Sequence, residues 1–136
     1  MPRKTKAGNP ARAEARLRPL ARARTRIALV LTAAVVAARE AGIQVVMVTG
    51  DHPATALAIA REAGIDAQRA VLGDELASWD DARVAAELPR LHVIARSTPT
   101  QKERLVRIAR EAGRTVAVTG DGVNDAPALK AAHIGI

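Results

Sequence analysis

Apolar residues recur at helical spacing in some segments of this chain and form short β-branched runs in others. The helical spacing predicts helices over 28–41, 53–63, 80–88, 98–112 and 125–132. The short runs predict strands near 43–48, 92–95, 115–118 and 134–136. Helices and strands that alternate in this order are typical of a parallel sheet covered by helices. The pattern therefore predicts an α/β fold.

Glycines mark the ends of three of these helices. Gly42, Gly64 and Gly113 stand where a left-handed residue would close a helix. Two of the α-then-β units are similar, because each helix ends in Ala-Arg-Glu-Ala-Gly and each following strand ends in Thr-Gly-Asp. The spacing between glycine and Thr-Gly-Asp differs by one residue, which indicates a recurrent α/β unit and not a tandem repeat.

The longest apolar run extends from Ile27 to Ala38 and is interrupted only by Thr32. It is shorter than the roughly 20 residues that a helix needs to span a bilayer. It also begins late and continues directly into a helix end, unlike a signal peptide. We therefore expect an amphipathic core helix, and no transmembrane helix in this chain.

Composition limits the chemistry that the chain can perform. There is no cysteine, which excludes disulfides and thiolate zinc sites. Its three histidines, at positions 52, 92 and 133, lack metal-ligand spacing. Trp79 is the only aromatic residue, so the chain offers no row of aromatic platforms for bases or adenine. We expect Trp79 to pack against the helix that follows it.

Positive charge is concentrated at the start of the chain. Residues 1–26 contain nine Lys and Arg against one acid, Glu14, whereas residues 27–136 contain twelve against thirteen. Several prolines and few apolar residues predict that this basic Ala/Arg-rich tail is disordered. Its charge would also suit nucleic acid or anionic lipid. The same composition arises when GC-rich DNA is translated in an unintended frame.

Three further arginines, Arg104, Arg107 and Arg110, share one side of a predicted helix. We expect them to be solvated or paired with Glu103 and Glu111, and not to form a stripe that binds nucleic acid.

Chemistry-bearing residues gather in Thr119 to Lys130, TGDGVNDAPALK. This stretch lies between a predicted strand and a helix that Pro127 opens, where α/β proteins commonly bind ligands. Its glycines let backbone amides approach an anion. Asp121 and Asp125 are hard oxygen ligands of the kind that Mg²⁺ prefers beside phosphate. The segment predicts a Mg²⁺ and phosphate site.

TGDGVNDAPALK resembles the hinge motif of the P-type ATPases, the cation pumps within the haloacid dehalogenase superfamily. Gly42 to Ile65 resembles the strand, TGD turn and helix that precede the hinge, and Ala95 to Ala109 resembles the stretch whose proline opens a lysine-bearing helix. The three segments occur in the family's order. The pair His52-Pro53 is similar to the calcium, sodium and magnesium pump branch.

The resemblance implies a haloacid-dehalogenase-like, Rossmann-like parallel sheet over 27–136, incomplete at its N-terminal side. It implies phosphate contacts at Thr49, Gly50, Asp51 and Asn124. It also implies that Lys102 neutralises charge on phosphate, that Asp121 and Asp125 hold Mg²⁺, and that ATP is the family substrate.

One part of the family's machinery is missing from the sequence. P-type pumps are phosphorylated on the aspartate of an Asp-Lys-Thr-Gly motif, and the chain has no such motif. Its first aspartate is Asp51, which lacks the following Lys-Thr. Moving the attacking atom to another strand would displace it by about 4.8 Å, more than a near-attack geometry tolerates. We therefore expect no nucleophile.

Two hypotheses follow for the function. The chain is expected to be an inactive fragment of a P-type cation-transporting ATPase. As part of a pump, the fragment would join the missing pump domains or a complementary polypeptide at the cytoplasmic face of a membrane. By itself, it would be soluble in the cytoplasm. Alternatively, it is a free-standing Mg²⁺- and phosphate-binding regulatory module with a basic tail. A small phosphatase is a weaker option because it needs a nucleophile. Nucleic acid is not an expected partner.

Overall fold

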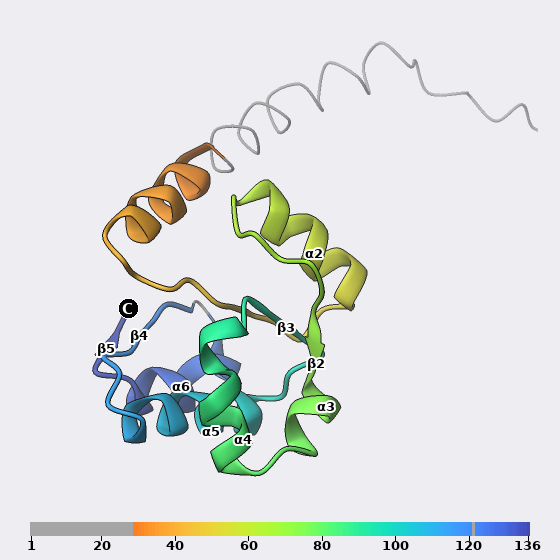
Figure 1. Ribbon diagram of the computed structural model, residues 1–136, viewed down its shortest axis with the longest axis vertical. Coiled ribbons are helices and arrows are strands. Elements are labelled where there is room, and N and C mark those ends of the chain that lie inside the picture. Colours follow the sequence, from red (N-terminus) through yellow and green to blue (C-terminus); the bar gives the residue numbers. More distant parts are fainter. Residues whose placement is uncertain (1–28, 121) are drawn as a thin grey trace, which may run out of the picture.

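The structure is a computed structural model that describes residues 29–120 and 122–136 (Figure 1). Within these residues, the strands are all parallel and lie in two sheets. The first has the order β1-β3-β2, formed by β1 (Met47–Val48), β2 (Val71–Leu72) and β3 (Val93–Ala95). The second pairs β4 (Ala117–Val118) with β5 (Ile134–Gly135). The α/β prediction is confirmed.

Helices cover both faces of the first sheet (Figure 1). Within the described residues, the chain forms a helix through 29–40, α2 (Pro53–Glu62), α3 (Gly73–Ala77), α4 (Asp81–Glu87), α5 (Pro99–Glu111) and α6 (Ala126–Ala131). Of these, α6 packs on α5 and β5. Two short 3-10 turns occupy Leu88–Arg90 and Val123–Asp125. Within the described residues, no helix combines the length and the apolar composition needed to cross a bilayer.

Strand β3 lies at the centre of the core. Val93 and Ala95 face a cluster that includes Ala56 and Ala60 of α2, whereas Ile94 faces a second cluster beneath α3, α4 and α5. The three β3 residues are at most 1% exposed. A strand buried on both faces needs an unbroken apolar sequence, because its side chains alternate between the two faces.

Several sequence predictions need correction in detail. Strand pairing is shorter than expected, since only residues 47–48 of the predicted strand 43–48 pair with a neighbour. The short elements β2 and α3 were not predicted. The single expected sheet is two sheets, because no backbone pairing joins β1 to β4 within the described residues. The basic tail, 1–26, lies outside the described residues.

The predicted core helix also differs from expectation. The helix through 29–40 is largely exposed, with Leu29 at 72% and Val30 at 69%. Only positions 32, 35 and 38 are partly buried, so one narrow stripe of the helix contacts the domain. Burial within the described fold therefore does not account for the apolar run of this helix.

Helix ends follow the glycine prediction. Gly42, Gly64 and Gly113 have φ of 77°, 80° and 79°, a region that other residues avoid. After α2, the Ile65 amide donates to the Ala60 carbonyl, which satisfies a helix-end acceptor.

Two histidines have structural roles that the sequence did not reveal. His52 precedes α2, and its Nδ1 accepts a hydrogen bond from the Ala54 amide at 3.2 Å. His133 Nδ1 accepts from the Val116 amide, also at 3.2 Å, and so ties α6's exit to β4. In each of these two histidines, Nδ1 accepts a hydrogen bond from a backbone amide.

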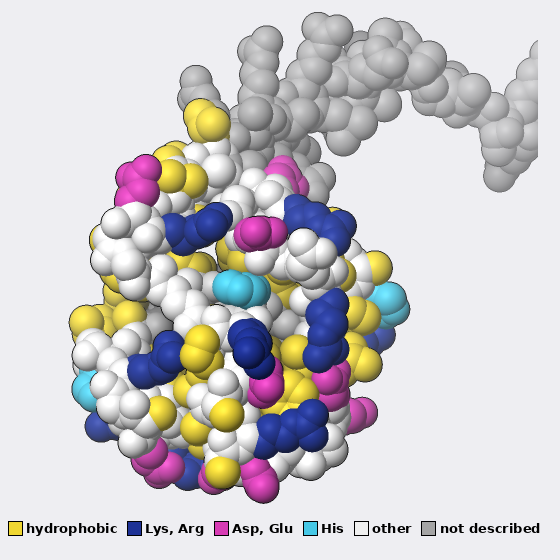
Figure 2. Space-filling view, in the orientation of Figure 1, with side chains coloured by type: hydrophobic (Ala, Val, Ile, Leu, Met, Phe, Trp, Pro, Cys, Tyr) yellow, Lys and Arg dark blue, Asp and Glu magenta, His cyan; other side chains and the backbone are white. Residues whose placement is uncertain are grey.

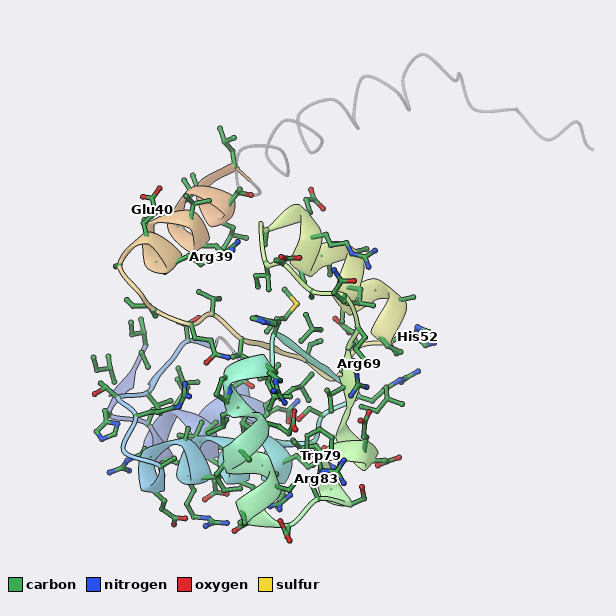
Figure 3. All side chains as sticks on the ribbon, in the orientation of Figure 1. Arg39, Glu40, His52, Arg69, Trp79 and Arg83 are labelled. Carbon is green, nitrogen blue, oxygen red and sulfur yellow. The ribbon has the colours of Figure 1, made fainter. Side chains whose placement is uncertain are left out.

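Trp79 packs as predicted, in the core cluster beneath α4. The Arg83 guanidinium lies over its ring, 4.6 Å from the centroid (Figure 3). A cation at this distance is attracted by the negative face of the ring. Trp79 is therefore a packing residue.

Arg104 joins α5 to the segment between α3 and α4. Its guanidinium donates to the carbonyls of Leu76 and Trp79 at 3.1 and 2.7 Å, and to Asp81 Oδ1 at 2.6 Å. Arg107 reaches Asp81 at 2.8 Å and also pairs with Glu111. Hydrogen bonds from Arg107 and then Arg104 lower the pKa of the Asp81 carboxyl below its ordinary 3.8. The predicted pairing with Glu111 is confirmed, and Asp81 is an unforeseen partner.

We expect Arg104→Lys to lower the free energy of unfolding by about 1–2 kcal/mol, because an ammonium cannot hold both carbonyls and the carboxylate in one fork. Arg107→Lys is the matched control and should lower the free energy of unfolding by less, because the ion pairs of Arg107 are more exposed than the contacts of Arg104. Urea unfolding measures both variants. Equal losses would contradict the role given to Arg104.

Candidate functional site

The first part of the site lies where β1 and β3 end side by side. Thr49, Gly50 and Asp51 follow β1, and residues 96–98 follow β3. The Ser97 amide donates to the Thr49 carbonyl at 2.9 Å, and the Arg96 amide donates to the Asp51 carbonyl at 3.0 Å. These bonds fix the TGD turn against the start of α5.

Within this turn, the Asp51 amide donates to Thr49 Oγ1 at 3.1 Å. The side chain of Asp51 is exposed. Arg96 has a φ of 53°, a left-handed value found at no other non-glycine residue of the described chain. This conformation turns the backbone out of β3 and toward Thr98.

The second part of the site is the start of α5. Thr98 Oγ1 accepts from the Gln101 amide, and the Gln101 side chain accepts from the Thr98 amide, which is a capping box. Lys102 lies one turn into the helix, where its amide donates to the Thr98 carbonyl at 3.0 Å. The helix start therefore sets the direction of the lysine.

Lys102 Nζ lies 2.6 Å from Asp125 Oδ1. The two side chains are 16% and 21% exposed, so the pair is shielded but not sealed from water. This contact joins α5 to the TGDGVND segment across 23 positions of sequence. A charge-assisted hydrogen bond of this length is among the stronger polar contacts in proteins.

Asp125 is also held from the side of β4. A Cβ at Gly120 would lie 2.7 Å from Asp125 Oδ2 and 2.8 Å from its Cβ. The Asp125 amide donates to the Gly122 carbonyl at 3.0 Å. Gly120 is therefore required by a close approach, and the carboxylate lies between the glycine backbone and the Lys102 ammonium.

The structure thus brings together only part of the predicted site. Lys102 and Asp125 are in contact, and Thr49 and Asp51 accept backbone hydrogen bonds from Ser97 and Arg96, just before α5. The side chain of Asn124 is exposed. Asp121 lies outside the described residues. In the part of the chain that is described, no three carboxylates or histidines gather as a metal site.

Comparisons with known proteins identify the family of this chain. A family model described as haloacid dehalogenase-like hydrolase matches residues 6–133. The chain belongs to the haloacid dehalogenase-like hydrolase family. This haloacid dehalogenase-like chain is 47% identical over 100 residues to calcium-transporting ATPase 1 of Bacillus cereus. It is 51% identical over 107 residues to the cation-transporting ATPase pma1 of Synechocystis.

It is also 41% identical over 103 residues to the magnesium-transporting ATPase, P-type 1, of Salmonella typhimurium. These three alignments cover 72%, 76% and 76% of the chain. The predicted resemblance to P-type cation pumps is confirmed. The haloacid dehalogenase-like chain spans only 11–12% of the length of these relatives.

Sequence reasoning missed the residues that orient the site. Gln101 Nε2 donates to the Gly73 carbonyl at 3.0 Å, which ties the start of α5 to α3. A Cβ at Gly73 would lie 2.4 Å from the Arg96 carbonyl oxygen, so α3 presses closely on the same turn. The Thr-Pro-Thr-Gln spacing of a capping box was the available signal.

We expect Gly120→Ala to lower the free energy of unfolding by about 1–3 kcal/mol, because its methyl group would overlap both the carboxylate and Cβ of Asp125. Gly122→Ala is the matched control, since its Cβ would meet Asp125 Oδ2 at an ordinary 3.7 Å. Thermal unfolding followed by circular dichroism compares the two. Similar losses would show that the close approach at Gly120 does not constrain the site.

Proposed function

We propose that this chain is part of the haloacid dehalogenase-like domain of a P-type cation-transporting ATPase. In this proposal it keeps the Mg²⁺ and phosphate-binding part of the domain and lacks the aspartate that is phosphorylated. The contact between Lys102 and Asp125 carries the proposal, because it joins two of the three segments that resemble these pumps.

The phosphate role rests on charge and on backbone donors. Lys102 supplies an ammonium from α5, and the segment just before α5 is hydrogen-bonded to the turn that follows β1. In that turn, Thr49 and Gly50 would direct a hydroxyl and an amide at phosphate oxygens. Asn124 and Asp51 would complete the polar surroundings. Phosphoryl transfer depends mainly on such positioning and neutralisation.

The donor chemistry also fits Mg²⁺. This ion takes one or two carboxylates and completes its shell with water and phosphate oxygens. Asp125 offers one carboxylate beside the close backbone of Gly120, and Asp121 would offer the second. When bound, the ion would neutralise negative charge on the phosphate.

The division of the sheet supports a missing nucleophile strand. β1 and β4 each have one unpaired edge within the described residues. Val46, Val48 and Val116 pack against the same core cluster, and Arg114 donates to Gln44 Oε1 at 3.0 Å, joining the segments before the two strands. One further parallel strand between β1 and β4 would complete a continuous sheet.

The whole-pump setting follows from the relatives' names. Calcium, magnesium and unspecified cations are transported by the proteins that the chain resembles. The proposed domain would lie on the cytoplasmic face of a membrane, receive phosphate from ATP and contact the other pump domains.

The phosphate site is tested by titrating the full chain with inorganic phosphate, with and without Mg²⁺, in a calorimeter. Affinity should depend on Mg²⁺ and fall at least about tenfold in Lys102→Met, because one charge-assisted contact is lost. Lys130→Met, on the exposed side of α6, is the control and should bind like the original chain. Mg²⁺-independent binding, or equal losses in the two variants, would contradict the site.

The missing nucleophile predicts that radiolabelled ATP and Mg²⁺ leave no phosphate on the chain. An acid-stable labelled product that is lost in Asp51→Asn would overturn this expectation, since it would make Asp51 the attacking group.

A further inference from the structure

Two of the three histidines accept a backbone hydrogen bond through the same ring nitrogen. His52 Nδ1 accepts from the Ala54 amide and His133 Nδ1 accepts from the Val116 amide, each at 3.2 Å. His92 makes no side-chain hydrogen bond within the described residues. A ring nitrogen that accepts a hydrogen bond carries no proton. Both bonds therefore require a neutral imidazole with its proton on Nε2.

Protonation of the ring removes this acceptor. An imidazolium carries a proton on each nitrogen, so it can only donate hydrogen bonds. Imidazole is the side chain that takes up a proton between about pH 8 and 5. Both rings are exposed, and Figure 2 shows histidine side chains at the surface of the molecule. Each bond is therefore available while its ring is neutral and is lost as pH falls through this range.

His133 holds the residue before β4 at two points. Its own amide donates to the Val116 carbonyl at 3.0 Å, while its ring accepts from the Val116 amide. The sheet that follows is small, because β4 and β5 are two residues each. β4 leads to Gly120, which lies against Asp125. Loss of the ring acceptor would leave the Val116 amide to water and weaken the support of the TGDGVND segment.

His52 holds the other turn of the candidate site. It follows the TGD turn directly and is the N-cap of α2, where its ring satisfies an amide that the first helical turn leaves unpaired. A positive ring at this position would also face the positive end of the helix dipole. The first turn of α2 contains no acidic side chain. The neighbouring Asp51 is exposed, and in Figure 3 the His52 ring points away from the domain.

The charged groups beside His133 are equal in number of each sign. The ring lines a surface depression together with four charged side chains of α5, which are Glu103, Arg107, Arg110 and Glu111. Lys130 is the one charged residue of α6 and lines a separate depression. The net charge of the side chains in the first depression therefore favours neither state of the ring.

We propose that His52 and His133 form a pH-sensitive device that loosens both turns of the candidate site when the rings are protonated. The TGD turn is then held less firmly by the start of α2, and β4 is held less firmly by residue 133. Any consequence for phosphate binding rests on the proposed function. The loosening itself does not, and it is measured without ligand.

The test is amide hydrogen exchange of the full chain, followed by NMR at about pH 7.5 and 5.5. Rates are expressed as protection factors, which remove the intrinsic effect of pH on exchange. Protection of Val116 and Ala54 should fall about fivefold at the lower pH, because each amide loses one hydrogen bond. The Ile65 amide donates to the Ala60 carbonyl at 2.8 Å and is the matched control, whose protection should not change.

Substitutions by asparagine assign each response to one ring. His133→Asn keeps an acceptor that does not titrate, so Val116 should be equally protected at both pH values while Ala54 still responds. His52→Asn should give the converse result, since asparagine is also a favoured N-cap. His92→Asn is the control variant, and both responses should remain as in the original chain.

Several results would overturn the proposal. Unchanged protection of Val116 and Ala54 in the original chain would show that neither bond depends on pH, and this result needs no variant to fold. A Val116 response that persists in His133→Asn, or disappears in His92→Asn, would assign it to another group. An equal loss at Ile65 would indicate general loosening by acid. A response at one amide alone would remove the other histidine from the device.

Discussion

Burial of one face of helix α5 is the interaction on which the described fold depends. Leu105, Val106, Ile108 and Ala109 are buried on it. Full burial of each larger aliphatic side chain contributes roughly 1.5–3 kcal/mol. The helix packs against α3, α4 and α6 and lies beneath elements of both sheets. Without it, two- and three-residue strands would have no common support.

The polar contacts of α5 are distributed along its length. Its first turn holds α3 through Gln101 and the site through Lys102, and its middle holds the α3–α4 segment through Arg104. Near its end, Arg110 donates to the Ala131 carbonyl at 2.7 Å. The same helix thus fixes the core and positions the ammonium of the candidate site.

Much of this arrangement could be predicted because its signals are local. Pro99 and Gly113 mark the limits of α5, and the apolar run through Val93 and Ile94 marks the buried strand. The division into two sheets could not be predicted, because it depends on which strands find partners. The exposure of the helix through 29–40 was missed for a related reason. Apolar composition indicates that a surface needs a partner, but it does not identify which part of the protein, or which other molecule, covers that surface.

The site shows the same division between local and non-local information. TGD and TGDGVND identify their own turns, but nothing in the sequence around Lys102 indicates that its partner is Asp125. Nor does sequence reveal that Gly120 must lack a side chain because Asp125 lies against it. Such contacts depend on how α5 and α6 pack, and packing is fixed only by the whole fold.

The proposed function places one further strand between β1 and β4, and each of these strands has an unpaired edge within the described residues. Met47 and Thr49 donate to the backbone of the β3 segment, so Val48 directs its amide to the other edge. Val116 and Val118 accept from the β5 segment, which likewise directs Ala117 outward. The unpaired N–H and C=O groups of a free strand edge favour pairing with a further strand.

The most direct measurement is amide hydrogen exchange of the full chain, alone and with a peptide of four β-branched residues followed by Asp-Lys-Thr-Gly. In the chain alone, Val48 and Ala117 should exchange much faster than the paired amides of Thr49 and Ile136. Saturating peptide should slow both outward amides, and a scrambled peptide should not. Slow exchange of Val48 and Ala117 in the chain alone, or no response to the peptide, would contradict the proposal that a strand is missing between β1 and β4.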